Sequence, residues 1–169
     1  VTLTDRPTPT PAVSWTVKRQ NGIGGVMLTA SHNPPSFNGF KLKAHFGGSA
    51  PPEVCSAVEA LLDKSPVKAT PFADAVKSGQ VVVKDICPPY YAALKKLVDF
   101  KLIARSKLKF AHEALFGVGA GCFDGLLAGT TCKVTTLNAA HDPFFGGINP
   151  EPNPKNYGRS IDHLAKHPH

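Results

Sequence analysis

Short apolar runs alternate along the chain with stretches of helical periodicity, and this alternation constrains the fold more than any other feature. Residues 23–29 form a glycine-containing apolar run without alternation, as expected of a strand buried on both faces of a sheet. Residues 54–62 place their apolar side chains on one helical face. The regular succession of such strands and helices favours an α/β architecture with largely parallel sheets.

Turn and cap signals divide the chain into elements. Thr10 followed by Pro11 predicts the start of a helix, with Thr10 as its N-cap. The stretch 65–79 loses helical periodicity and is the best linker candidate, so we expect two domains, residues 1–78 and 79–169. The expected helices are 10–20, one from 51, one from 88, 122–128 and 161–166, and the expected strands are 23–29, 40–43, 81–83, 108–115 and 132–137.

Composition narrows the class of protein. The net charge of +7 comes from 19 Lys+Arg against 12 Asp+Glu, but the basic residues are scattered, so we expect a solvated surface and no nucleic-acid partner. The four cysteines form no C-x-x-C pair and no secretory leader is visible, which indicates mostly buried thiols in a cytoplasmic protein. No apolar stretch reaches the roughly 18 to 20 residues of a membrane span, so no membrane partner is expected.

The thirteen residues from Thr29 to Lys41 carry the clearest chemistry. They place Ser31 just beyond an apolar strand, and two prolines stiffen the loop that follows. His32, Asn33 and Lys41 can supply donors and positive charge to a phosphorylated serine, which carries about −1.5 to −2 charges near pH 7. The set suits a group that accepts, holds and returns a phosphoryl group, whereas a shorter Ser-His-Asn-Pro run alone would favour a plain turn.

Residues 29–34 and 38–41, Thr-Ala-Ser-His-Asn-Pro and Asn-Gly-Phe-Lys, resemble the phosphoserine loop of the α-D-phosphohexomutases, the phosphoglucomutase/phosphomannomutase family. Residues 8–14 resemble that family's segment before its active-site strand, and residues 108–121 and 137–153 resemble the start of its second domain. The resemblance implies an internal fragment, with the later part of domain 1 and most of domain 2. Both incomplete domains would be three-layer α/β/α units with mixed, largely parallel sheets.

The same resemblance implies a reaction. Phospho-Ser31 would give its phosphoryl group to a hexose 1- or 6-phosphate and recover one from the hexose 1,6-bisphosphate, so that phosphate moves between C1 and C6. Ser31, His32 and Lys41 are the expected catalytic residues, and Ser31, His32, Asn33 and Lys41 the expected substrate contacts. Lys41 would transfer a proton or stabilise charge, with His32 as a contact or accessory acid and base. Phospho-Ser31 would also be a ligand of Mg2+, the expected cofactor.

The resemblance further implies parts that these residues lack. No Asp-x-Asp-x-Asp run occurs among the 169 residues, and the chain ends before the family's metal-binding loop. The sugar-recognition and distal phosphate loops belong to further domains, which are therefore expected partners. We expect residues 1–169 alone to be inactive or nearly so. The alternative is a non-catalytic truncated homologue that binds sugar phosphates or a protein partner.

Two further groups of residues suggest other kinds of site, a nucleotide site and a metal site, but more weakly. Residues 117–121 are glycine-rich, but Cys122 stands where a dinucleotide fingerprint needs a glycine, so a tight strand-to-helix turn is favoured over a nucleotide site. His163, His167 and His169 are spaced so that they could hold a transition metal, but they lie at the end of the chain, where fraying is expected.

Overall fold

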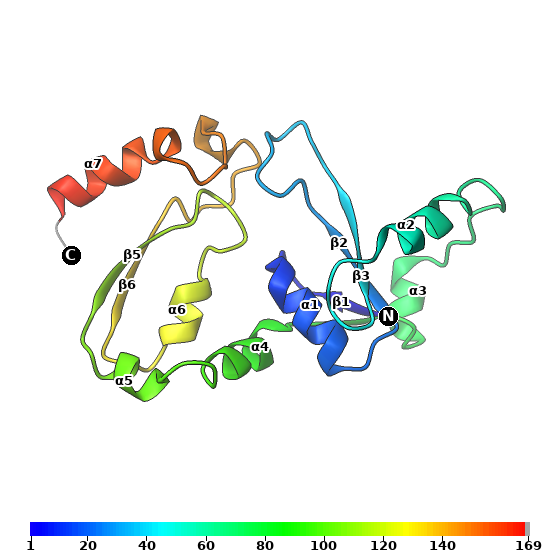
Figure 1. Cartoon of the computed structure of the whole chain (residues 1–169), viewed down its shortest axis with the longest axis horizontal. Helices are drawn as coiled ribbons and strands as arrows, with labels where there is room; N and C mark the ends of the chain where they lie inside the picture. Colours follow the sequence, from blue (N-terminus) through cyan, green and yellow to red (C-terminus); the bar gives the residue numbers. More distant parts are fainter. Residues whose placement is uncertain (168–169) are drawn as a thin grey trace. The chain divides into compact units, whose positions relative to one another are not determined.

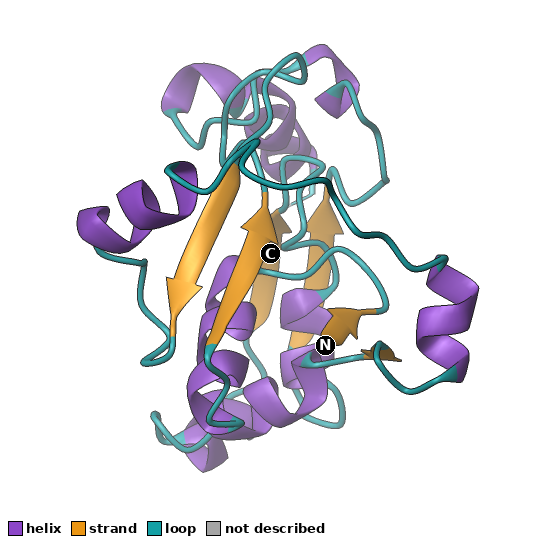
Figure 2. Cartoon of the chain, turned by 90° about the vertical axis from the view of Figure 1, so that its right-hand side faces the viewer, coloured by secondary structure: helices purple, strands orange, loops and turns teal. Residues whose placement is uncertain are grey.

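The computed structural model describes residues 1–167, and its contacts divide the chain into two compact units in which short strands alternate with helices (Figures 1 and 2). Unit 1 comprises Val1–Met27 and Phe40–Tyr90, and unit 2 comprises Leu28–Gly39 and the residues from Tyr91 onward. The loop that carries Ser31 therefore belongs to unit 2. The domain boundary expected after residue 78 stays a prediction.

Unit 1 contains two small sheets. Strand β1 pairs in parallel with β4, with Thr2 opposite Val82, and β2 pairs with β3. Beyond the first pair, an ion pair joins Arg6 to Asp85, and the Asp85 carboxylate raises the pKa of Arg6 above its ordinary value. The elements are β1 (Thr2–Thr4), α1 (Thr10–Arg19), β2 (Gly24–Leu28), β3 (Phe40–Ala44), α2 (Pro52–Glu59), α3 (Phe72–Lys77), β4 (Val82–Lys84) and α4 (Cys87–Leu94), which contains the boundary between the units.

Unit 2 is built around one parallel strand pair, β5 and β6, which run side by side in Figure 1. Helix α6 lies between them in sequence and packs on β6, where the Thr136 hydroxyl donates to the Asp124 carboxylate at 2.7 Å. This strand–helix–strand unit confirms the prediction of parallel α/β units. The elements are α5 (Phe100–Ala104), β5 (Lys109–Glu113), α6 (Cys122–Leu127), β6 (Lys133–Leu137), 3-10 helices at Phe145–Gly147 and Pro154–Asn156, and α7 (Gly158–Lys166).

Glu113, the last residue of β5, ties together three parts of unit 2. Its carboxylate accepts hydrogen bonds from the backbone N–H of Leu115, from the amide of Asn138 after β6, and from the hydroxyl of Ser160 in α7. Ser160 is buried, so the bond between β5 and α7 is partly shielded from water. These bonds anchor both ends of the long loop between β6 and α7.

Several details differ from the sequence predictions. The run 23–29 forms β2 but is not buried on both faces, because β2 pairs with β3 in a two-stranded sheet and leaves Leu28 66% exposed. Helix α2 buries none of its apolar stripe. Thr10 is the first helical residue and does not cap α1, because the first turn bonds to the carbonyl of Pro9. The stretch 65–79, expected to be a linker, contains α3.

The expectations about cysteine burial and about membrane spans can be compared with the described residues. Of the four cysteines only Cys87 is buried, so the prediction of mostly buried thiols is wrong, and the structure joins none of them in a disulfide within residues 1–167. Over the same residues, every helix is too short or too polar to cross a bilayer. The expected cytoplasmic location stays a prediction.

Candidate functional site

The loop between β2 and β3 is closed at its base by a hydrogen bond from the N–H of Thr29 to the carbonyl of Gly39, at 2.9 Å. A Cβ at residue 39 would lie 2.5 Å from the Thr29 carbonyl oxygen, which is closer than real Cβ atoms approach. Only glycine allows the two backbone segments to meet at this distance. The N–H of Gly39 also bonds to the side chain of Asn38, at 2.8 Å.

Ser31 lies at the exposed tip of this loop, in a backbone conformation that its neighbours hold in place. Its φ angle is +61°, in the left-handed region that residues other than glycine rarely adopt. The Ser31 N–H donates to the Thr29 hydroxyl at 2.9 Å. Asn33 closes the turn with two bonds to the carbonyl of Ala30, from its backbone N–H at 3.1 Å and from its side-chain amide at 2.9 Å. The serine hydroxyl is thus presented on a restrained backbone.

His32 has a carboxylate neighbour that the sequence did not predict. Its Nδ1 lies 3.4 Å from Oε1 of Glu151, in the loop between β6 and α7 of the same unit. Both side chains are about half exposed. Glu151 lies in the segment 137–153, which resembles the family's second domain, and no local signal links two residues so far apart in sequence. The hydrogen bond to the Thr29 hydroxyl was not predicted either. A threonine hydroxyl that bonds to the backbone two residues later is a known turn pattern, so the sequence did carry a local signal for it.

Lys41 is the second residue of β3, and its side chain is exposed. Ser31, His32 and Asn33 lie together in the loop of unit 2, whereas Lys41 belongs to unit 1. The roles assigned to these four residues stay predictions.

Metal-ligating side chains do not gather in the part of the chain that the structure describes. No group of three or more His, Cys, Asp or Glu residues there could hold a metal ion. The rings of His163 and His167 lie 4.7 Å apart, and His169 falls outside the described residues.

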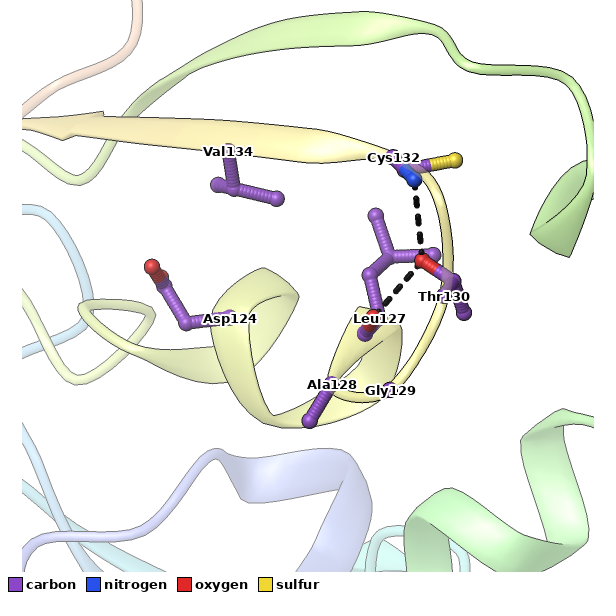
Figure 3. Close-up of a pocket in the computed structure, with 7 residues that line it drawn as sticks. All are labelled: Asp124, Leu127, Ala128, Gly129, Thr130, Cys132 and Val134. Carbon is purple, nitrogen blue, oxygen red and sulfur yellow. Dashed lines mark hydrogen bonds between the residues drawn. The ribbon is translucent and has the colours of Figure 1, made fainter.

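A shallow hollow of about 220 Å3 lies at the turn between α6 and β6 (Figure 3). Its polar groups already have partners: the Thr130 hydroxyl donates to the Leu127 carbonyl at 2.7 Å and accepts from the N–H of Cys132 at 3.2 Å. The carboxylate of Asp124 accepts from Thr136. The glycine-rich turn before α6 ends at Gly121, the N-cap residue of the helix, which has a positive φ of 77°. These features stabilise the strand–helix–strand unit and do not form a second site.

Comparison with known families decides the identity. Residues 1–68 match the model of phosphoglucomutase/phosphomannomutase alpha/beta/alpha domain I, and residues 88–169 match the model of domain II. The chain belongs to the phosphoglucomutase/phosphomannomutase family. The resemblance inferred from the Ser31 loop is therefore confirmed, and so is the α/β fold class.

Curated members of this family match most of the chain. A phosphoglucomutase/phosphomannomutase of Thermococcus kodakarensis is 34% identical over 148 residues, which is 88% of this chain and 32% of the relative. A phosphoglucomutase of Neisseria meningitidis serogroup B is 36% identical, covering 87% of this chain and 30% of the relative. A phosphoglucosamine mutase of Methanococcus vannielii is 30% identical, covering 91% and 33%. The chain thus spans about a third of the length of these phosphohexomutases.

Solved structures of this fold agree with the family assignment. A Thermus thermophilus crystal structure assigned as a phosphomannomutase superposes with a TM-score of 0.86 at 33% identity, covering 99% of this chain and 37% of its own. The open form of Paramecium pp63/parafusin shares the fold at 23% identity, with a TM-score of 0.76, covering 95% of this chain and 34% of its own.

Proposed function

We propose that this chain carries the phosphoserine of a phosphohexomutase, with Ser31 as the residue that holds the phosphoryl group. The observation that supports this most directly is the exposed Ser31 hydroxyl, presented on a loop whose backbone is held by Thr29 and Asn33. A fixed donor suits phosphoryl transfer, in which positioning and charge stabilisation supply most of the catalysis.

In the proposed reaction, a hydroxyl oxygen of a hexose monophosphate attacks the phosphorus of phospho-Ser31. A new P–O bond forms to the sugar, the bond between phosphorus and the Ser31 oxygen breaks, and the hydroxyl proton passes to a base. The product is a hexose 1,6-bisphosphate. After this intermediate has reoriented, the Ser31 oxygen attacks the phosphorus of its other phosphate. The bond between that phosphorus and the sugar oxygen breaks, and the sugar oxygen takes up the proton held by the base. The products are the monophosphate with its phosphate on the other carbon and phospho-Ser31.

The neighbouring groups have distinct proposed tasks. Lys41 would stabilise the charge of the transferred group or move the proton, because its ammonium group is a compact cation on a flexible stem. His32 would contact the substrate and act as an accessory acid and base. The Asn33 amide donates to the Ala30 carbonyl, so its first contribution is to shape the turn, with a contact to the substrate as its second.

Mg2+ is the proposed cofactor, and its Lewis acidity would help to neutralise the transferred phosphate. Phospho-Ser31 could supply one oxygen ligand, and oxygen ligands are those that Mg2+ prefers. Residues 1–167 offer no cluster of three carboxylate, imidazole or thiolate groups beside it, so they do not make up a magnesium site by themselves. The proposal therefore assigns to the described residues only the phosphoserine contact.

The proposal is tested by finding the phosphate. The full-length protein that contains these residues should, as purified or after incubation with glucose 1,6-bisphosphate, carry one phosphate on Ser31, located by peptide mass spectrometry. Labelled phosphate on that serine should then move to added glucose 1-phosphate or mannose 1-phosphate.

The matched control is Ser36, a second exposed serine of the same loop. Ser36→Ala should leave labelling unchanged, whereas Ser31→Ala should abolish it together with mutase activity. Phosphate on a different residue, or full activity of Ser31→Ala, would refute the proposal and favour a homologue that binds sugar phosphates without turnover.

A further inference from the structure

The contact between His32 and Glu151 brings a carboxylate to the residue next to the proposed phosphoserine. The Nδ1 to Oε1 distance is 3.4 Å, and both residues belong to unit 2. The contact joins the Ser31 loop to the loop between β6 and α7 within the same unit.

A carboxylate at this distance distinguishes the two ring nitrogens of His32. A lone pair on Nδ1 would face the negative oxygen and be repelled, whereas a proton on Nδ1 is attracted. A neutral imidazole with its proton on Nδ1 keeps its free lone pair on Nε2, and only that nitrogen can then accept a proton. The position of Glu151 thus sets which His32 atom is available for acid–base chemistry.

Both partners stand on restrained segments. Pro150 and Pro152 flank Glu151 and fix their own φ angles. The Glu151 carbonyl accepts from the N–H of Asn153 at 2.9 Å and from the side-chain amide of Asn156 at 2.8 Å. Exposed ion pairs usually lose most of their benefit to the ordering of flexible chains, and this loss is smaller when both backbones are already held.

We propose that Glu151 is a positioning residue for the phosphoryl-transfer reaction, acting through His32. Its carboxylate keeps the proton of the neutral imidazole on Nδ1, orients the ring, and leaves Nε2 as the nitrogen that exchanges a proton with the sugar hydroxyl. This role rests on the proposed function, but the state of the imidazole can be measured without any turnover.

The test compares three variants in the full-length protein labelled with 15N-histidine: Glu151→Ala, Glu151→Asp and the control Glu59→Ala, which removes an exposed carboxylate from α2. At roughly pH 8, where an ordinary imidazole is neutral, the nitrogen chemical shifts of His32 report its tautomer. His32→Ala identifies its signals. The wild type and Glu59→Ala should show the Nδ1–H form, Glu151→Ala a mixture, and Glu151→Asp a return toward the wild type.

Kinetics supply the second readout. Glu151→Ala should lower kcat roughly fivefold with little change in KM, as expected for one half-exposed contact to a carboxylate, and Glu151→Asp should recover most of the loss. Unchanged His32 nitrogen shifts in Glu151→Ala would overturn the inference, and so would equal loss of kcat in both Glu151 variants. Failure of the proposed function would instead appear as wild-type protein without phosphate on Ser31, with the His32 tautomer still under the control of Glu151.

Discussion

At the scale of single residues, the Ser31 loop combines one strained position with several local bonds that maintain it. A residue other than glycine in the left-handed region costs about 1–2 kcal/mol, and Ser31 has a φ of +61°. The Thr29 hydroxyl and the Asn33 amide supply the bonds that offset this cost. Strain held in this way is often found at functional positions, which agrees with the role proposed for Ser31.

Gly39 offers a direct test of this loop. Gly39→Ala would place a Cβ 2.5 Å from the carbonyl oxygen of Thr29, so the base of the loop must shift. We expect a loss of about 2 kcal/mol in the free energy of unfolding, measured by urea denaturation, together with slower phosphorylation of Ser31. Gly158→Ala is the control, because nothing lies within 4 Å of its added Cβ. Equal stability of the two variants would show that the approach of residues 29 and 39 is not restrictive.

Sequence reasoning identified the chemical groups of this loop but could not find all their partners. Ser31, His32 and Asn33 were singled out because hydroxyl, imidazole and amide groups follow one another beside two prolines. Glu151 was missed because its contact with His32 depends on where the loop after β6 runs, and residue spacing carries no record of that. The need for glycine at residue 39 is likewise a matter of the distance between two backbones.

At the scale of elements, Glu113 is the main polar connection of unit 2. Its carboxylate accepts hydrogen bonds from donors after β5, after β6 and in α7. Glu113→Ala would leave these donors without their acceptor, including the hydroxyl of buried Ser160. We expect a loss of about 2 kcal/mol in the free energy of unfolding, since each lost bond leaves a poorly solvated donor.

The control for this prediction lies in the same strand. Lys109 is exposed, so Lys109→Ala should change the free energy of unfolding by less than about 0.5 kcal/mol. Both variants are compared by urea denaturation monitored by circular dichroism. A Glu113→Ala protein as stable as Lys109→Ala would mean that the bonds around the carboxylate are replaced by water at little cost.

The elements that the sequence predicted well are those with several independent signals. For α1, the Thr10-Pro11 start signal and Asn21-Gly22 after its end agree, and the structure places the helix at Thr10–Arg19. Helix α5 was missed because five residues are too few to show periodicity, although Asp99 caps it by accepting from the N–H of Leu102 at 3.0 Å. Helix α3 was missed within the expected linker because its six residues are too few to show helical periodicity, although Pro71 stands directly before it.

At the scale of the whole molecule, the accessible surface is large for the mass. It measures 11705 Å2 for a chain of 17.9 kDa, whereas one compact domain of this mass exposes about 8,000 Å2 and two domains of half the mass about 9,700 Å2 together. The burial of these side chains could not be predicted from the spacing of apolar residues alone. The spacing shows which face of a helix or strand is apolar, but it does not show whether another element packs against that face. The exposed stripes of β2 and α2 agree with a chain that spans about a third of its relatives.

The exposed apolar side chains predict that residues 1–169 associate with one another when they are produced alone. Ile23 and Val67 are 100% and 94% exposed, and unpartnered apolar side chains and strand edges favour association between chains. We expect self-association that grows with concentration in sedimentation velocity. Replacing both residues by lysine should reduce it without lowering the free energy of unfolding, because neither side chain packs against the rest of the chain.

The matched control separates lost apolar surface from added charge. Ala139 and Ala140 are also exposed, so changing both to lysine adds the same two charges while removing almost no apolar area. If association falls only in the Ile23→Lys and Val67→Lys protein, apolar contact drives it. Equal reduction in both double variants would assign the association to net charge. A wild type that stays monomeric at all concentrations would show that the exposed apolar side chains do not drive association.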